Sequence, residues 1–108
     1  MSDQSRQDER AERRAARVEI GAYHEAEMAE LIDHVREALG RYDAGQIDVF
    51  ELDDVIHQYK RATQELWKFC VGGGGHVLTA ARTLEWLKSE GSLPNWWEAG
   101  RPRRRRET

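Results

Sequence analysis

Imidazole, thiol and carboxylate side chains in the middle of the chain have the chemistry to bind a metal ion or supply a nucleophile. His57, Cys70 and His76 show none of the short spacings that are typical of zinc sites. Asp54 and His57 have the spacing of one half of a di-iron carboxylate site, but the preceding segment offers no matching pair. The sequence therefore predicts no metal site, no cofactor and no catalytic residue, and we expect a protein that is not an enzyme.

The segment GQIDVFEL at residues 45–52 resembles the end of the calcium-binding loop of EF-hand proteins. The resemblance places Glu51 where the bidentate calcium ligand belongs. A calcium ion needs six to eight oxygen ligands, so side-chain oxygens are also required at loop positions one, three and five. Those positions hold Gly40, Tyr42 and Ala44, none of which is a carboxylate or an amide. We therefore expect no calcium site.

The same segment carries the signals of a helix start. Asp48 and Glu51 have the spacing of a capping box, and Ile47 and Leu52 have that of a hydrophobic staple. The apolar pattern that follows predicts a helix over residues 48–70. A helix over residues 20–44 precedes it, and the short connection predicts an antiparallel hairpin.

The glycines at positions 72–75 predict a linker, and residues 76–90 predict a third helix. The expected fold class is all-α: a long antiparallel helical hairpin plus a third helix, in a small three-helix bundle with charged, disordered ends. Residues 1–19 are expected to be a charged extension (a frayed helix or disordered), residues 20–97 the helical domain, and residues 98–108 a basic tail.

Composition bounds the class of protein. Of the 108 residues, 34% are charged and 39% hydrophobic, the formal net charge is −3, and there is one cysteine. A single cysteine excludes an internal disulfide, which fits a reducing compartment. No apolar run approaches the roughly 18 residues of a membrane span. We expect a cytoplasmic protein that does not enter a membrane.

Arginines gather at both ends of the chain. On a helix, four of the N-terminal arginines fall within a sector of roughly 60°; they are Arg6, Arg10, Arg13 and Arg17. The C-terminal cluster is Arg103, Arg104, Arg105 and Arg106. Both groups are candidate contacts for a polyanion or an acidic protein surface. The alternative is a solubilising extension that binds nothing specific.

Two adjacent tryptophans follow Pro94 in a segment that we expect to be an extended arm. Neighbouring side chains of an extended chain point to opposite faces, so one of Trp96 and Trp97 should pack on the helices. The other becomes a candidate partner contact, because tryptophan is enriched at binding hot spots. In the alternative arrangement, both rings pack on the hairpin.

These features favour a small non-enzymatic helical interaction or regulatory protein that acts through helix packing and charged tails. The small core makes a homo-oligomer a reasonable expectation. The alternative function is that of an accessory protein that associates weakly with nucleic acid through its arginine-rich ends.

Overall fold

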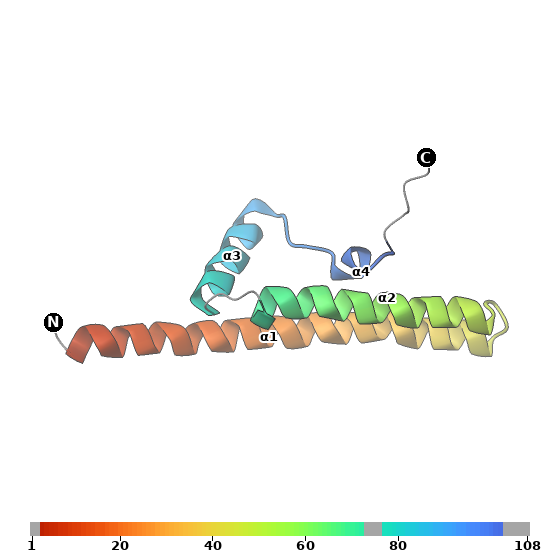
Figure 1. Ribbon diagram of the computed structural model, residues 1–108, viewed down its shortest axis with the longest axis horizontal. Helices are drawn as coiled ribbons and strands as arrows, with labels where there is room; N and C mark the ends of the chain where they lie inside the picture. Colours follow the sequence, from red (N-terminus) through yellow and green to blue (C-terminus); the bar gives the residue numbers. More distant parts are fainter. Residues whose placement is uncertain (1–2, 73–76, 103–108) are drawn as a thin grey trace. The chain divides into compact units, whose positions relative to one another are not determined.

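Every regular element of the described residues is a helix. The computed structural model describes residues 3–72 and 77–102. The elements are α1 (Asp3–Asp43), α2 (Val49–Trp67), the π-helical turn η1 (Lys68–Gly72), α3 (Val77–Glu90) and α4 (Trp96–Ala99). The predicted all-α fold, with its long antiparallel hairpin and third helix, is confirmed (Figure 1).

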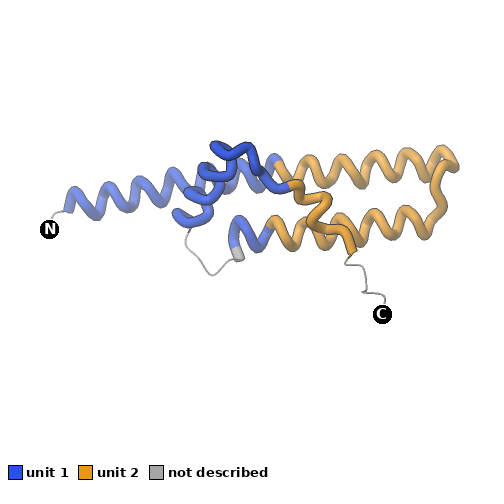
Figure 2. Tube along the Cα trace, turned by 90° about the horizontal axis from the view of Figure 1, so that it is seen from above, with its two compact units in different colours: residues 1–26, 67–94 blue, residues 27–66, 95–108 orange. Residues whose placement is uncertain are grey.

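The chain divides into two compact units, which Figure 2 shows in different colours. Unit 1 contains residues 1–26 and 67–94, and unit 2 contains residues 27–66 and 95–108. Helix α1 is continuous and contributes residues to both units.

In unit 2, the turn between α1 and α2 has the hydrogen bonds that its sequence predicts. Gly45 adopts a φ of +76°, a left-handed conformation that favours glycine after a helix. The backbone N–H of Glu51 donates to the Asp48 side chain (2.8 Å), and the backbone N–H of Asp48 donates to the Glu51 side chain (3.0 Å). This reciprocal pair confirms the capping box.

The hairpin buries small and branched side chains between its helices. The buried residues of unit 2 on α1 and α2 are Leu31, Ala38, Leu52, Ala62 and Leu66. Two of these are alanines, which let helices approach each other closely because they project little from the helix surface. The hairpin is therefore a tight helix pair with a narrow core.

The segment that follows Pro94 differs from the expected extended arm. Asn95 caps a short helix, because its side chain accepts a hydrogen bond from the backbone N–H of Glu98 (3.1 Å). Helix α4 therefore presents Trp96 and Trp97 from a helical turn, and the extended arm is wrong at these residues.

Unit 1 combines the first part of α1 with η1 and α3. Its buried apolar residues are Ala16, Ile20, Cys70, Ala81 and Leu84. The rings of Tyr23 and Phe69 meet edge to face, with centroids 6.0 Å apart. The sequence predicts a third helix from His76, whereas α3 begins at Val77, and residues 73–76 lie outside the described residues.

Helix α1 begins at Asp3, well before the start of the apolar pattern at Ile20. Contacts with α3 account for part of this extension. Ala16 is buried, and the Arg82 guanidinium lies 3.9 Å from the Glu12 carboxylate. The residues between Asp3 and Ile20 also include several alanines, arginines and glutamates, which are strong helix formers.

The capping box makes the hairpin sensitive to one side chain. Asp48→Ala removes the acceptor for the Glu51 N–H and should lower the free energy of unfolding by about 1 kcal/mol. Asp48→Asn is the matched control, because it retains an oxygen acceptor and should stay close to wild type. Urea unfolding followed by circular dichroism measures both. Equal stability of all three proteins would show that this cap does not hold the start of α2.

Candidate functional site

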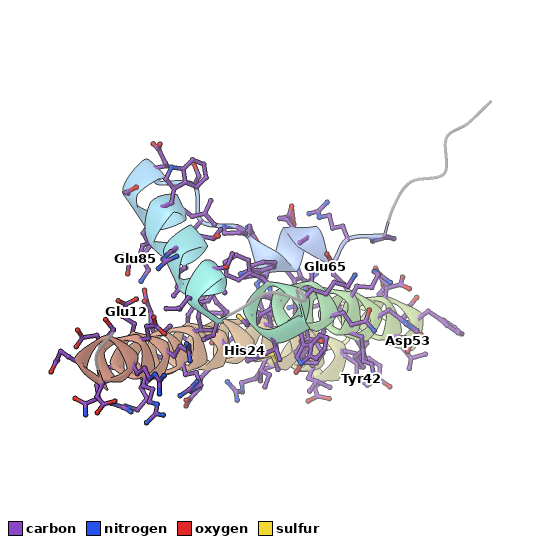
Figure 3. The ribbon with its side chains drawn as sticks, turned by 60° about the vertical axis from the view of Figure 1, so that its left-hand side comes forward. Glu12, His24, Tyr42, Asp53, Glu65 and Glu85 are labelled. Atoms are coloured by element: carbon purple, nitrogen blue, oxygen red, sulfur yellow. The ribbon has the colours of Figure 1, made fainter. Side chains whose placement is uncertain are left out.

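Besides Phe50, five large apolar side chains of the hairpin in unit 2 are exposed. They are Ile32 (41% exposed), Leu39 (45%), Tyr42 (40%), Val49 (52%) and Ile56 (39%), and we call them the hairpin stripe. Figure 3 labels Tyr42. Ile32 and Leu39 are seven residues apart on α1, and Val49 and Ile56 are seven apart on α2, so each pair lies on one side of its helix.

The contacts of α4 with the hairpin show on which side of the hairpin the stripe residues lie. The Trp97 ring stacks on the His34 ring, with centroids 4.2 Å apart and an interplanar angle of 2°, and the Trp97 carbonyl accepts from Gln58 (2.8 Å). Ile32 is two positions from His34, and Ile56 is two positions from Gln58, so each isoleucine points about 160° away from its neighbour in contact with α4. By the same 100° spacing, Ile32, Leu39, Val49 and Ile56 lie on the face opposite α4, and Tyr42 lies midway between that face and His34.

One ion pair and one contact between a histidine and a carboxylate flank the hairpin stripe. The Arg36 guanidinium lies 2.6 Å from the Asp33 carboxylate on α1, and the His57 imidazole lies 3.2 Å from the Asp53 carboxylate on α2. Arg36 and Asp53 sit one turn from stripe residues on the outer side of each helix. The edges of the face thus offer both acidic and basic groups.

Helix α4 covers the other face of the hairpin with both tryptophans. Trp96 is only 9% exposed and Trp97 is half-buried. The Arg61 guanidinium donates to the Gly100 carbonyl (2.6 Å) and anchors the end of α4 on α2. Both rings pack in unit 2, which is the second of the two arrangements expected from the sequence.

The N-terminal arginines lie on α1 in unit 1. Arg6, Arg10 and Arg17 are exposed, and Arg13 is half-buried, with its guanidinium 3.5 Å from the Glu9 carboxylate. The C-terminal cluster, residues 103–106, lies outside the described residues. Polyanion binding by either group therefore stays a prediction.

Unit 1 also contains a cavity of about 640 Å³ between α1, η1 and α3. Helix α1 lines it with Arg17, Ile20, Gly21 and His24, and Figure 3 labels His24. The turn η1 contributes four consecutive residues, 68–71, and α3 contributes residues from its first two turns. The sequence analysis missed this cavity because its walls come from three separate segments.

Two glutamates of unit 1 interact between α1 and α3. A side-chain hydrogen bond with Glu85 raises the pKa of Glu19 above its ordinary value of 4.5, and burial and the Glu85 charge act in the same direction. The Lys88 ammonium, 3.9 Å from the Glu19 carboxylate, lowers that pKa. In unit 2, burial and then the charge of Glu30 raise the pKa of Glu27.

The described residues contain no cluster of three or more histidine, cysteine, aspartate or glutamate side chains placed to hold a metal ion. A search of the described helices for a segment long and apolar enough to cross a membrane found none. Comparison with protein-family models, curated proteins and solved structures gave no match to this chain. The features that could carry a function are therefore the hairpin stripe of unit 2 and the cavity of unit 1.

Gly100 should be required for the docking of α4. A Cβ atom at this position would lie 2.5 Å from the Gln58 carbonyl oxygen and 2.6 Å from the Ala62 nitrogen, both of which are backbone atoms. Gly100→Ala should therefore lower the free energy of unfolding by about 1–3 kcal/mol, as overpacked sites do. Gly40→Ala is the control, because nothing lies within 4 Å of its Cβ and alanine favours the helix. If Gly100→Ala and Gly40→Ala lower the urea midpoint equally, the close contact of Gly100 with α2 is not what makes this glycine necessary.

The pair formed by Glu19 and Glu85 should make unit 1 less stable as pH rises. Glu19 holds its proton more tightly in the folded protein than in the unfolded chain. The free energy of unfolding therefore falls as the pH rises from the ordinary pKa of 4.5 to the raised pKa of the folded protein. Glu19→Gln removes the titrating carboxyl, and Glu85→Gln removes the carboxylate that raises its pKa, so either variant should flatten this fall. Urea unfolding at a series of pH values measures the slope. Curves for both variants that run parallel to wild type would exclude the coupling.

Proposed function

We propose that this chain is a small non-enzymatic interaction protein that associates with a second copy of itself through the hairpin stripe. The observation that carries the proposal is the exposure of four large apolar side chains of the hairpin stripe on the face opposite α4, with Tyr42 at its edge. Single exposed apolar residues are ordinary on protein surfaces, whereas contiguous patches mark interaction sites.

The area of the hairpin stripe suits a dimer. Taking about 200 Å² as the full surface of each large residue, the exposed fractions correspond to roughly 400 Å² per chain. This lies within the range of roughly 300–600 Å² for the largest apolar patch on a typical monomer, which is often functional. It is about half of the ~800 Å² that each partner contributes to a standard interface.

The shape and charge of this face favour a second copy as the partner. Two antiparallel hairpins that pack face to face form a four-helix bundle, in which the a and d positions of all four helices are covered. A two-fold axis makes each copy contact the same face of the other. The edges carry Arg36 and His57 as well as Asp33 and Asp53, so acidic groups of one copy have basic partners available on the other.

The alternative function, weak association with nucleic acid, stays a prediction. It would use the exposed guanidinium groups of Arg6, Arg10 and Arg17, but acidic residues alternate with them along α1. Nucleic-acid-binding surfaces are usually basic throughout. The hairpin stripe has the stronger support because its exposed apolar side chains recur at seven-residue spacing on both helices.

Sedimentation equilibrium over a range of protein concentrations tests the proposal. Wild type should form a dimer that dissociates on dilution, and the double variant Ile32→Glu, Ile56→Glu should stay monomeric because each dimer would bury four carboxylates. Phe50→Glu is the matched control: Phe50 is 77% exposed on α2, and its side chain points away from the stripe.

Circular dichroism confirms that each variant remains helical. A wild-type protein that is monomeric at every concentration would refute self-association. Dissociation by Phe50→Glu as complete as that by the double variant would refute the assignment of the interface to the hairpin stripe.

A further inference from the structure

The cavity of unit 1 combines an apolar interior with cationic side chains. Its volume of about 640 Å³ lies within the range of small-molecule sites. Ile20 on α1, Phe69 on η1 and Ala80 on α3 supply apolar walls. Among the described residues, the titratable lining side chains are Arg17, His24, Lys68 and Cys70, and none is a carboxylate. The chemistry of the walls therefore suits a ligand with an apolar body and a negative charge.

The residues of α1 that line the cavity follow one another along one face of the helix. Arg17, Ile20, Gly21 and His24 follow a spacing of three, one and three residues, so they form one stripe on the helix. The two apolar positions lie between the two basic ones, and one helical turn rises about 5.4 Å. An alkyl chain laid over Ile20 and Gly21 would place its head group within reach of Arg17.

Arg17 is the group best suited to hold that charge. Its side chain is exposed, and within the described residues its guanidinium takes part in no ion pair. A guanidinium stays charged across the ordinary pH range and binds carboxylates with two parallel hydrogen bonds.

Gly21 leaves the middle of this stripe open. A Cβ built at this position meets nothing within 4 Å, so packing inside the folded chain does not require a glycine there. Glycine in a helix costs about 1 kcal/mol relative to alanine. A ligand that lies against the helix backbone at Gly21 would account for a glycine at this position.

The π-helical turn η1 forms the opposite wall. Residues 68–71 all contribute to the lining of the cavity. Short π-helical segments are frequent at functional sites.

We propose that this cavity binds an anionic amphiphile, an alkyl chain with an ionised carboxylate head, with the chain against Ile20, Gly21 and Phe69 and the head on Arg17. This site lies in unit 1 and is independent of the hairpin stripe in unit 2.

Isothermal titration calorimetry with three probes of equal chain length tests the proposal: decanoate, decanol and decyltrimethylammonium, each below its micelle-forming concentration. The full-length protein should bind decanoate saturably with one site per chain. Decanol should bind about threefold to tenfold more weakly, the value of one charge-assisted contact. The cationic probe should bind more weakly than decanol.

Matched variants locate the site. Gly21→Leu fills the cavity and should abolish binding of both decanoate and decanol, whereas Gly40→Leu, on the same helix outside the cavity, should bind as wild type does. Gly21→Ala is a milder filling that should weaken binding at least about threefold. Arg17→Gln should reduce decanoate affinity to that of decanol, and Arg14→Gln should leave it unchanged.

Circular dichroism and urea unfolding confirm that each variant is folded. Absence of saturable decanoate binding to wild type would overturn the proposal. Equal affinities for decanoate and decanol would overturn it as well, because they would show that the charged head makes no favourable contact. Unchanged binding by Gly21→Leu would also overturn it, because it would show that the ligand binds outside the cavity. A wild-type affinity for decanoate in Arg17→Gln would likewise refute the assignment of the head group to Arg17.

Discussion

The constraint on which unit 2 depends is that a pair of helices has two open faces and α4 covers only one. The stack of Trp97 on His34 and the close approach of Gly100 to α2 fix α4 on its face. The opposite face retains the hairpin stripe, with side chains 39% to 52% exposed. Apolar area of this extent favours burial at about 25 cal/mol per Å², and the proposed dimer follows from that imbalance.

Local signals in the sequence were sufficient for the hairpin. The capping box at Asp48 and Glu51 depends on residues three apart, and Gly45 adopts the conformation that a helix end requires. Both are short-range features whose geometry the backbone determines, so they could be predicted. The conformation after Pro94 could not, because α4 is held by contacts of Trp97 and Gly100 with residues far away along the chain.

The candidate sites were predictable only in part. The apolar pattern predicted helices over residues 20–44 and 48–70 but could not separate the part of each apolar face that packs within the hairpin from the part that stays exposed. That separation depends on the angle at which the two helices meet. The cavity of unit 1 is formed by α1, η1 and α3 together. Gly21, which lines it, has no side chain, so a hydrophobicity pattern could not identify it as a lining residue.

The central claim, that two copies meet through the hairpin stripe, is tested most directly by isotope-filtered nuclear Overhauser spectroscopy on an equal mixture of labelled and unlabelled protein. The account predicts contacts between chains from the methyl groups of Ile32, Leu39 and Ile56, and none from Leu84, which is buried in unit 1. At concentrations where the protein is dimeric, contacts between chains that exclude the hairpin stripe would contradict it.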